Sequence, residues 1–266
     1  MAITALHTAA TGMQALSTKI DVIANNIANA DTIGFKSSRA NFQDLLYQIR
    51  SQPGVQTSSN TTSPLPTQIG LGVAISNTQL RFTQGSVMTT GLSLDVAIQG
   101  DGFFQVELAD GGTAYTRAGN FIRNSDGELV LGNSIGYRLK DSPTIPDEIP
   151  TSNVSITPDG QVVAIDADGQ QQILGEIRLA RFPNPGGLLQ NGANVYLETG
   201  ASGTPVEATP GQDGMGTLLP GALELSNTEA VTELVELIKT QRVFQMNSQT
   251  INTADETLQV LANLKR

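Results

Sequence analysis

Apolar residues recur every seven positions at both ends of the chain, in two companion registers. Such a heptad pattern makes one helix pack along another, so it predicts two long amphipathic helices, over about residues 3–30 and 226–266. We interpret the apolar positions as assembly seams. The N-terminal seam comprises Leu6, Ala9, Met13, Leu16, Ile20, Ile23 and Ile27. The C-terminal seam comprises Val231, Leu234, Leu237, Ile238, Phe244, Ile251, Ala254, Leu258 and Leu261.

The ends of these helices carry recognisable signals. Asparagines and Gly34 follow the first seam, and both residue types tolerate the left-handed backbone that ends a helix. Ser226 and Glu229 form a capping box in front of the second seam. The chain then runs to its last residue without Pro or Gly.

The middle of the chain has a different pattern. Between residues 86 and 224, short alternating segments are separated by Asp-Gly pairs, each of which we expect to form the two central residues of a tight hairpin. Residues 35–85 form a connector, in which an apolar start is a candidate short helix and residues 48–68 are polar, proline-containing and extended. The predicted fold is α+β: an antiparallel β domain at 86–224, an irregular sandwich or barrel, flanked by coiled-coil-type helices at 1–34 and 225–266.

Composition argues against most kinds of chemistry. The net charge of −10 disfavours nucleic acid and anionic lipid as partners. Without cysteine there is no disulfide or thiolate catalysis, and with His7 as the single histidine there is no histidine metal cluster. Asp166 and Asp168 begin like a calcium loop, but no glutamate closes it, so an ordinary turn is preferred. We therefore expect a protein that is not an enzyme and binds no cofactor or metal.

Neither a secretory signal nor a membrane-spanning stretch is visible in the sequence, so we expect no membrane insertion, and export by some other route if the protein leaves the cytoplasm. An amphipathic helix most often packs on its own domain. Here the strict spacing of seven, the narrow stripe and the position at both chain ends favour assembly with further copies of the same chain.

Residues 21–36, DVIANNIANADTIGFK, carry a resemblance to a known family. This segment resembles the N-terminal signature of the axial proteins of the bacterial flagellum, and the likeness continues through LDVAIQGDGFFQV, AYTRAGNF and GALELSNTEAVTELVELIKTQR. The motif residues are Ala24, Asn25, Asn26, Asn29, Gly34, Phe35 and Lys36. The likeness covers essentially the whole chain, and the length and the connector match the distal rod type.

The resemblance implies a structural subunit of the basal-body rod, stacked helically into a hollow drive shaft across the periplasm. It implies as partners other copies, proximal rod and hook proteins, the outer ring proteins that act as a bushing, and the flagellar type III export apparatus. One alternative is another axial component, of the proximal rod or the hook. Another is a secreted glycan-binding β domain, which the lack of Trp and the presence of only 4 Tyr disfavour.

Overall fold

The computed structural model describes residues 2–53, 56–58, 61–62, 65–166 and 170–264. The chain divides into two compact units. The first, here called the helical unit, contains residues 1–27, 38–79 and 230–266, and the second, the β unit, contains residues 28–37 and 80–229. The Asp168-Gly169 pair lies outside the described residues.

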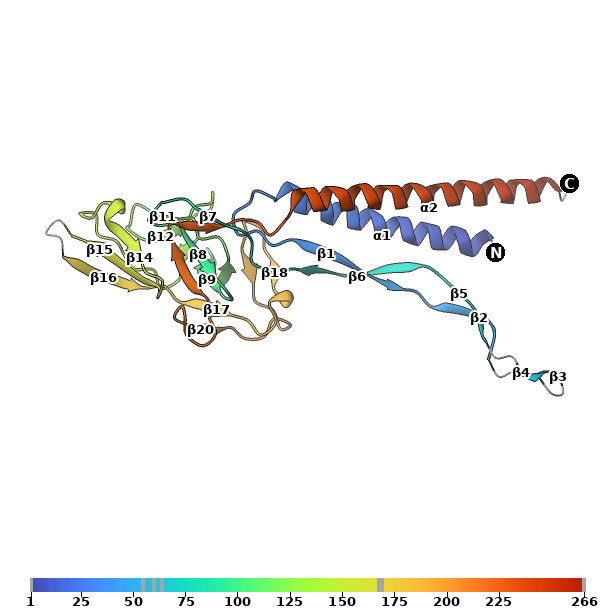
Figure 1. Cartoon of the computed structure of the whole chain (residues 1–266), viewed down its shortest axis with the longest axis horizontal. Coiled ribbons are helices and arrows are strands. Elements are labelled where there is room, and N and C mark those ends of the chain that lie inside the picture. The colour runs from blue at the N-terminus through green and yellow to red at the C-terminus, as the bar shows by residue number, and fades with distance from the viewer. Residues whose placement is uncertain (1, 54–55, 59–60, 63–64, 167–169, 265–266) are drawn as a thin grey trace. The chain divides into compact units, whose positions relative to one another are not determined.

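Two long helices dominate the helical unit. Helix α1 spans Ala2–Ala28 and helix α2 spans Ala230–Leu264, about 40 Å and 52 Å at 1.5 Å per residue. They lie side by side (Figure 1). Asn26 contacts Glu233, whereas Gly12 faces Asn247. Residue numbers therefore decrease along α1 as they increase along α2, so the two helices are antiparallel.

The start of α2 differs from the expected capping box. If Ser226 were the N-cap, the first helical residue would be Asn227. The helix instead begins three residues later, at Ala230. The Ser226 hydroxyl accepts the N–H of Thr228 at 3.1 Å, which closes a turn ahead of the helix. A serine hydroxyl reaches backbone N–H groups in a turn as readily as in a helix, so the motif located the region but not the first helical residue.

A two-stranded ribbon completes the helical unit (Figure 1). It takes the place of the expected short helix, and the described residues of the expected extended connector lie within it. The ribbon pairs β1 (Ser38–Asp44) with β6 (Val73–Leu80), β2 (Tyr47–Ser51) with β5 (Thr67–Gly70), and β3 (Gln56–Ser58) with β4 (Thr61–Thr62). Its apolar side chains stay exposed at Phe42, Leu46 and Tyr47. The expected helix is wrong because strand β6, distant in sequence, supplies the backbone hydrogen bonds.

The β unit is built from short strands. They are β7 (Val87–Thr89), β8 (Val96–Gln99), β9 (Phe103–Glu107), β10 (Thr113–Thr116), β11 (Phe121–Arg123), β12 (Leu129–Leu131), β13 (Arg138–Leu139), β14 (Val154–Ile156), β15 (Gln161–Ile165), β16 (Gln171–Glu176), β17 (Leu179–Arg181), β18 (Leu189–Gln190), β19 (Tyr196–Leu197), β20 (Val206–Ala208), β21 (Thr217–Pro220) and β22 (Ala222–Glu224). Two single-turn 3-10 helices lie at Thr151–Asn153 and Pro185–Gly187.

The largest sheet has the order β11-β12-β13-β9-β10-β19-β18, and β17 joins β9 to β20 beside it. Its strands pair antiparallel, as do those of the three-stranded sheet β14-β15-β16. Together with the two helices, these sheets confirm the α+β class. The coiled-coil winding of the helices and the closure of the sheets into a sandwich or barrel remain predictions.

Three Asp-Gly pairs form hairpin turns of one kind. Gly111, Gly127 and Gly160 have φ of 83°, 82° and 89°, and each donates its N–H to the carbonyl three residues earlier. The preceding aspartate does not share the positive φ, so the pair occupies the last two positions of a longer loop with a glycine bulge rather than both central positions. Asp101-Gly102 forms no hairpin, because β8 pairs with β21 and β9 with other strands.

The core of the β unit is apolar. Val96, Ile98, Phe104, Leu129 and Leu179 are completely buried. A second, aromatic cluster contains Phe103, Tyr115, Phe182, Tyr196 and the partly buried Phe82. These two clusters hold together the strands of the β unit.

Candidate assembly site

Small residues line the face of α1 that meets α2. Ala9, Gly12 and Ala15 are buried, together with Ile23 further along the same face. A Cβ added at Gly12 would lie 2.9 Å from the Asn247 side chain, so glycine allows the two helices to approach closely here. A glycine within a helix costs about 1 kcal/mol relative to alanine, which close packing must offset.

The structure divides the predicted C-terminal seam between two faces of α2. Leu237, Phe244, Ile251, Ala254 and Leu258 are half-buried and share the face of Thr240, which is 2% exposed. The remaining members with described side chains, Val231, Leu234 and Ile238, are 71%, 50% and 45% exposed on the other side. The side chain of Leu261 is not among those described.

The predicted N-terminal seam lies at the edge of the helix pair. Its members Ala9 and Ile23 are buried, whereas Leu6, Met13, Leu16, Ile20 and Ile27 are only half-buried. Contacts of either seam with other subunits remain a prediction.

Lys19 and Glu236 connect the two helices electrostatically. The Lys19 Nζ lies 2.5 Å from Glu236 Oε1, and Lys239, one turn along α2, lies 3.5 Å from the other carboxylate oxygen. The hydrogen bond from Lys19 holds the pKa of the Glu236 carboxyl below its usual range, although partial burial opposes the shift. Because both side chains remain accessible to water, the pair contributes little stability and mainly aligns the helices.

Asn26 is the motif asparagine that the structure buries, at 1% exposure. Its amide nitrogen donates to the Ser38 carbonyl at 2.8 Å, and its amide oxygen accepts the Ser38 N–H at 3.0 Å. The same nitrogen lies 3.3 Å from Glu233 Oε1 on α2. Asn26 therefore links three segments, the end of α1, the start of β1 and the first turn of α2. The neighbouring motif residues Ala24 and Asn25 are exposed, and Asn29 is half-buried.

The motif residue Lys36 belongs to a buried ion cluster in the β unit, formed with Glu224 and Arg117. Both Lys36 and Glu224 have no exposed surface, and Arg117 is 3% exposed. Glu224 Oε1 lies 2.5 Å from Lys36 Nζ, and Oε2 lies 3.3 Å from Arg117 Nη1. Glu224 Oε1 also accepts the N–H of Gly85 at 2.9 Å.

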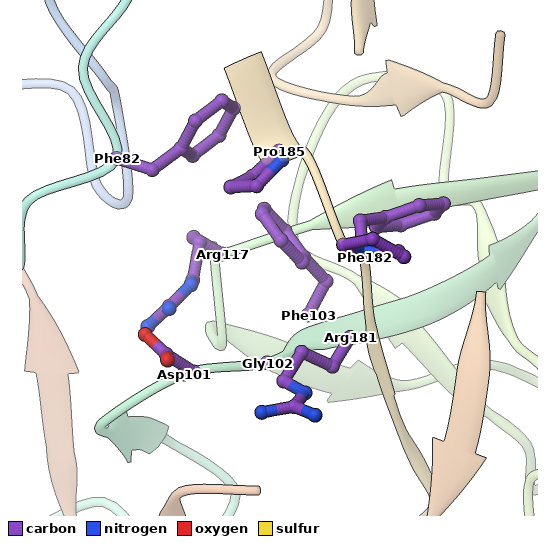
Figure 2. Close-up of a pocket in the computed structure, with 9 residues that line it drawn as sticks. Phe82, Asp101, Gly102, Phe103, Arg117, Arg181, Phe182 and Pro185 are labelled. Atoms are coloured by element: carbon purple, nitrogen blue, oxygen red, sulfur yellow. The ribbon is translucent and has the colours of Figure 1, made fainter. Parts of the chain in front are cut away.

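Two further contacts complete the cluster. Lys36 donates to the Thr83 carbonyl at 2.8 Å, and Arg117 donates to the Gly100 carbonyl at 2.9 Å. Burial lowers the pKa of Lys36, and the adjacent Glu224 carboxylate opposes that shift. Burial also lowers the pKa of Arg117, and the carboxylates of Glu224 and Asp101 oppose that shift (Figure 2). The charges are thus paired, as buried charges must be.

Gly34 brings the motif against this cluster. Its φ is +67°, and an added Cβ would lie 2.6 Å from the Ala118 nitrogen, so a side chain is excluded by both conformation and space. The Gly34 N–H donates to the Glu224 carbonyl at 2.7 Å. Phe35 beside it is 8% exposed. The motif therefore pins the chain that enters the β unit to the strand that leaves it.

A half-open cavity of about 330 Å³ lies next to Arg117 (Figure 2). Its walls include the rings of Phe82, Phe103 and Phe182 and the side chain of Arg181. The Arg117 guanidinium carbon sits 5.3 Å from the centre of the Phe103 ring, a cation–π arrangement. The walls of the cavity carry aromatic rings, the guanidinium groups of Arg117 and Arg181 and the carboxylate of Asp101, and its described lining includes no histidine, serine or cysteine.

Sequence reasoning missed four residues that these sites use: Gly12, Arg117, Glu224 and Asn227. Asn227 accepts the Ser37 N–H at 2.7 Å and donates to the Arg81 carbonyl at 2.7 Å. Gly12 and Glu224 did leave a signal, a glycine inside a helical pattern and a charge inside the apolar run Ala222–Leu225. Nothing local distinguishes Arg117 or Asn227 from surface residues.

Within the described ranges, no group of three or more His, Cys, Asp or Glu side chains is placed to hold a metal ion. In their described residues, neither α1 nor α2 combines the length and apolar character needed to cross a bilayer. Paired apolar helices, a ribbon and a β unit closed by a buried ion cluster define a structural subunit suited to assembly.

Comparison with known proteins identifies the family. Residues 6–36 match the model of the flagella basal body rod protein, residues 97–164 that of the flagellar hook protein FlgE/F/G D1 domain, and residues 219–264 that of the flagellar basal body rod FlgEFG protein C-terminal region. The chain is 43% identical to the flagellar basal-body rod protein FlgG of Borreliella burgdorferi over 263 residues, 98% of each chain. It is 44% identical to that of Caulobacter vibrioides over 98% of this chain and 99% of the relative.

The flagellar hook protein FlgE of Escherichia coli is a more distant relative, at 25% identity over a 419-residue alignment. The chain belongs to the flagellar basal-body rod protein family. This membership confirms the expectation of a structural rod subunit.

Proposed function

We propose that this chain is a subunit of the distal rod and that copies of it stack helically into a hollow shaft joining the proximal rod to the hook. The observation that carries the proposal is the full-length similarity to rod proteins in a chain whose terminal helices pair yet leave apolar side chains exposed. A monomer gains nothing from exposed Val231 or Leu234, whereas a polymer buries them.

In this proposal α1 and α2 form the inner tube and the β unit the outer layer. The proximal rod and hook proteins lie at the two ends of the segment, the outer ring proteins surround it, and the flagellar type III apparatus exports the subunits. The shaft would then cross the periplasm and transmit torque. The paired ribbon of residues 38–80 would supply additional contacts that stiffen the shaft, because its apolar residues are exposed.

Electron microscopy of basal bodies from cells lacking this chain tests the assignment, with the same strain carrying a restored gene as the control. We expect a short rod stub without outer rings or hook. Complete absence of a rod would assign the chain to the proximal rod, and a full rod without a hook would assign it to the hook. Normal basal bodies would contradict the rod role and return attention to glycan binding by the β unit.

A further inference from the structure

Helix α2 carries a second apolar row on the side away from α1, here called the outer stripe. It consists of Val231, Val235, Ile238, Arg242 and Met246. The four apolar members are 71%, 60%, 45% and 60% exposed, in that order. The residues that face α1, such as Thr240, lie about half a turn away at 100° per residue, so the chain's own α1 does not cover this row.

Helix α1 carries a matching row at its edge. Met13, Ile20 and Ile27 follow one another at intervals of seven and are half-buried by the chain's own fold. The ribbon covers a different face of α1, where Thr11 and Thr18 line a hollow with residues of β6. Part of this row is therefore still open to a partner.

The two rows are in register. Within one chain Asn26 stands opposite Glu233, and Gly12 stands opposite Asn247. The two α1 residues are fourteen positions apart, and so are the two α2 residues. A second copy displaced sideways without inversion keeps this alignment. Within one residue, Ile27 of one copy then lies level with Val231 of the other, Ile20 with Ile238, and Met13 with Met246. A spacing of seven on α1 thus meets spacings of seven and eight on α2.

Charge supports the same pairing. Asp21 is exposed and flanks the α1 row on the side away from the chain's own α2, and Arg242 interrupts the outer stripe. Among the described residues neither of them has an ion-pair partner in its own chain. In the register above Asp21 lies level with Ile238 of the second copy. Arg242 of that copy follows one helical turn further, roughly 6 Å along the helix axis, an axial offset that a long arginine side chain spans.

We propose that the outer stripe of α2 in one copy packs against the α1 row of the next copy, with Arg242 paired to Asp21 across the contact. The proposal rests on the function proposed above and specifies which faces meet. The two faces differ, so the contact is head-to-tail. Such contacts close into a ring when the copies stay level, and they continue into an open helical polymer when each copy is also shifted along the helix axis.

Charge reversal in full-length chains tests the pairing. The variants Asp21→Arg and Arg242→Asp, produced in cells whose own gene is deleted, should each lower the number of hook-bearing basal bodies about tenfold or more, because like charges then face each other. The double variant should restore assembly to near the unmodified level. Asp255→Arg reverses an exposed acid of α2 outside the outer stripe and should have little effect. Single variants that assemble normally, or a double variant that stays defective, would overturn the pairing.

Disulfide trapping tests the packing itself, since the chain contains no cysteine. Oxidation of basal bodies carrying Ile20→Cys with Ile238→Cys should give a ladder of linked subunits on a non-reducing gel. Ile20→Cys with Gln241→Cys, which lies beside the stripe, should give monomers. Monomers from the first pair in assembled rods would overturn the proposed contact and leave the rod function intact. Failure of the unmodified chain to restore rods would instead reject the proposed function.

Discussion

Replacing Glu224 by glutamine removes the charge of a carboxylate that two buried cations share. Glu224 accepts from Lys36 at 2.5 Å, from Arg117 at 3.3 Å and from the N–H of Gly85 at 2.9 Å, with no contact to solvent. The glutamine oxygen can still accept hydrogen bonds on one side of the site, but its NH₂ group would face a donor on the other side. Removing one member of a buried ion pair costs about 3–5 kcal/mol of stability. We expect Glu224→Gln to lower the free energy of unfolding by about 3 kcal/mol, because the carbonyls of Thr83 and Gly100 still accept hydrogen bonds from Lys36 and Arg117.

The measurement is denaturant and thermal unfolding of the full chain, monitored by near-ultraviolet circular dichroism of the tyrosines. Tyr115 and Tyr196 are buried in the β unit, so their signal reports on the unit that holds the cluster. For a unit of this size, a loss of about 3 kcal/mol lowers the melting temperature by roughly 6–12 °C.

A double-mutant cycle separates the ion pair from the shape of the site. Lys36→Met alone should cost about as much stability as Glu224→Gln, whereas the double variant with both substitutions should cost clearly less than the two single losses together, by about 1.5 kcal/mol or more. A loss below about 1 kcal/mol for Glu224→Gln, or strict additivity in the cycle, would refute a coupled buried cluster.

Three further changes probe the helical unit. Acidification below about pH 4.5 should weaken the helix pair. Because the pKa of Glu236 is lowered in the folded chain, its carboxylate stabilises the fold above the pKa of the unfolded chain, and this stability is lost as the carboxyl protonates. Helix melting followed as a function of pH should show the loss in the unmodified chain and not in Lys19→Met. Gly12→Ala should leave the free energy of unfolding nearly unchanged, since the gain in helix propensity offsets a small shift of the Asn247 side chain. Gly12→Leu should separate the helices and abolish rod assembly in cells. Normal assembly of the leucine variant would contradict close packing at this point. Asn26→Ala should lower the free energy of unfolding by about 1–3 kcal/mol in chemical denaturation, because it leaves the Ser38 backbone groups without these partners, and an unchanged midpoint would show that water replaces them.

Local pattern determined much of this protein without tertiary information. Seven-residue spacing predicted two long helices, because helical geometry alone places such residues on one stripe. Asp-Gly pairs marked three hairpins, because glycine readily adopts positive φ. The motif at residues 21–36 indicated the family, which the full-length relatives confirm.

Tertiary structure decided what local pattern leaves open. A heptad shows that a stripe is apolar, but not what covers it, so the division of the C-terminal seam between an α1-facing side and an exposed side became visible only in the fold. The ribbon strand at residues 38–44 depends on hydrogen bonds from residues 73–80, which no local propensity encodes. Lys36 and Glu224 are 188 positions apart in the chain, and their charges are tolerable in a buried interior only because folding brings them together.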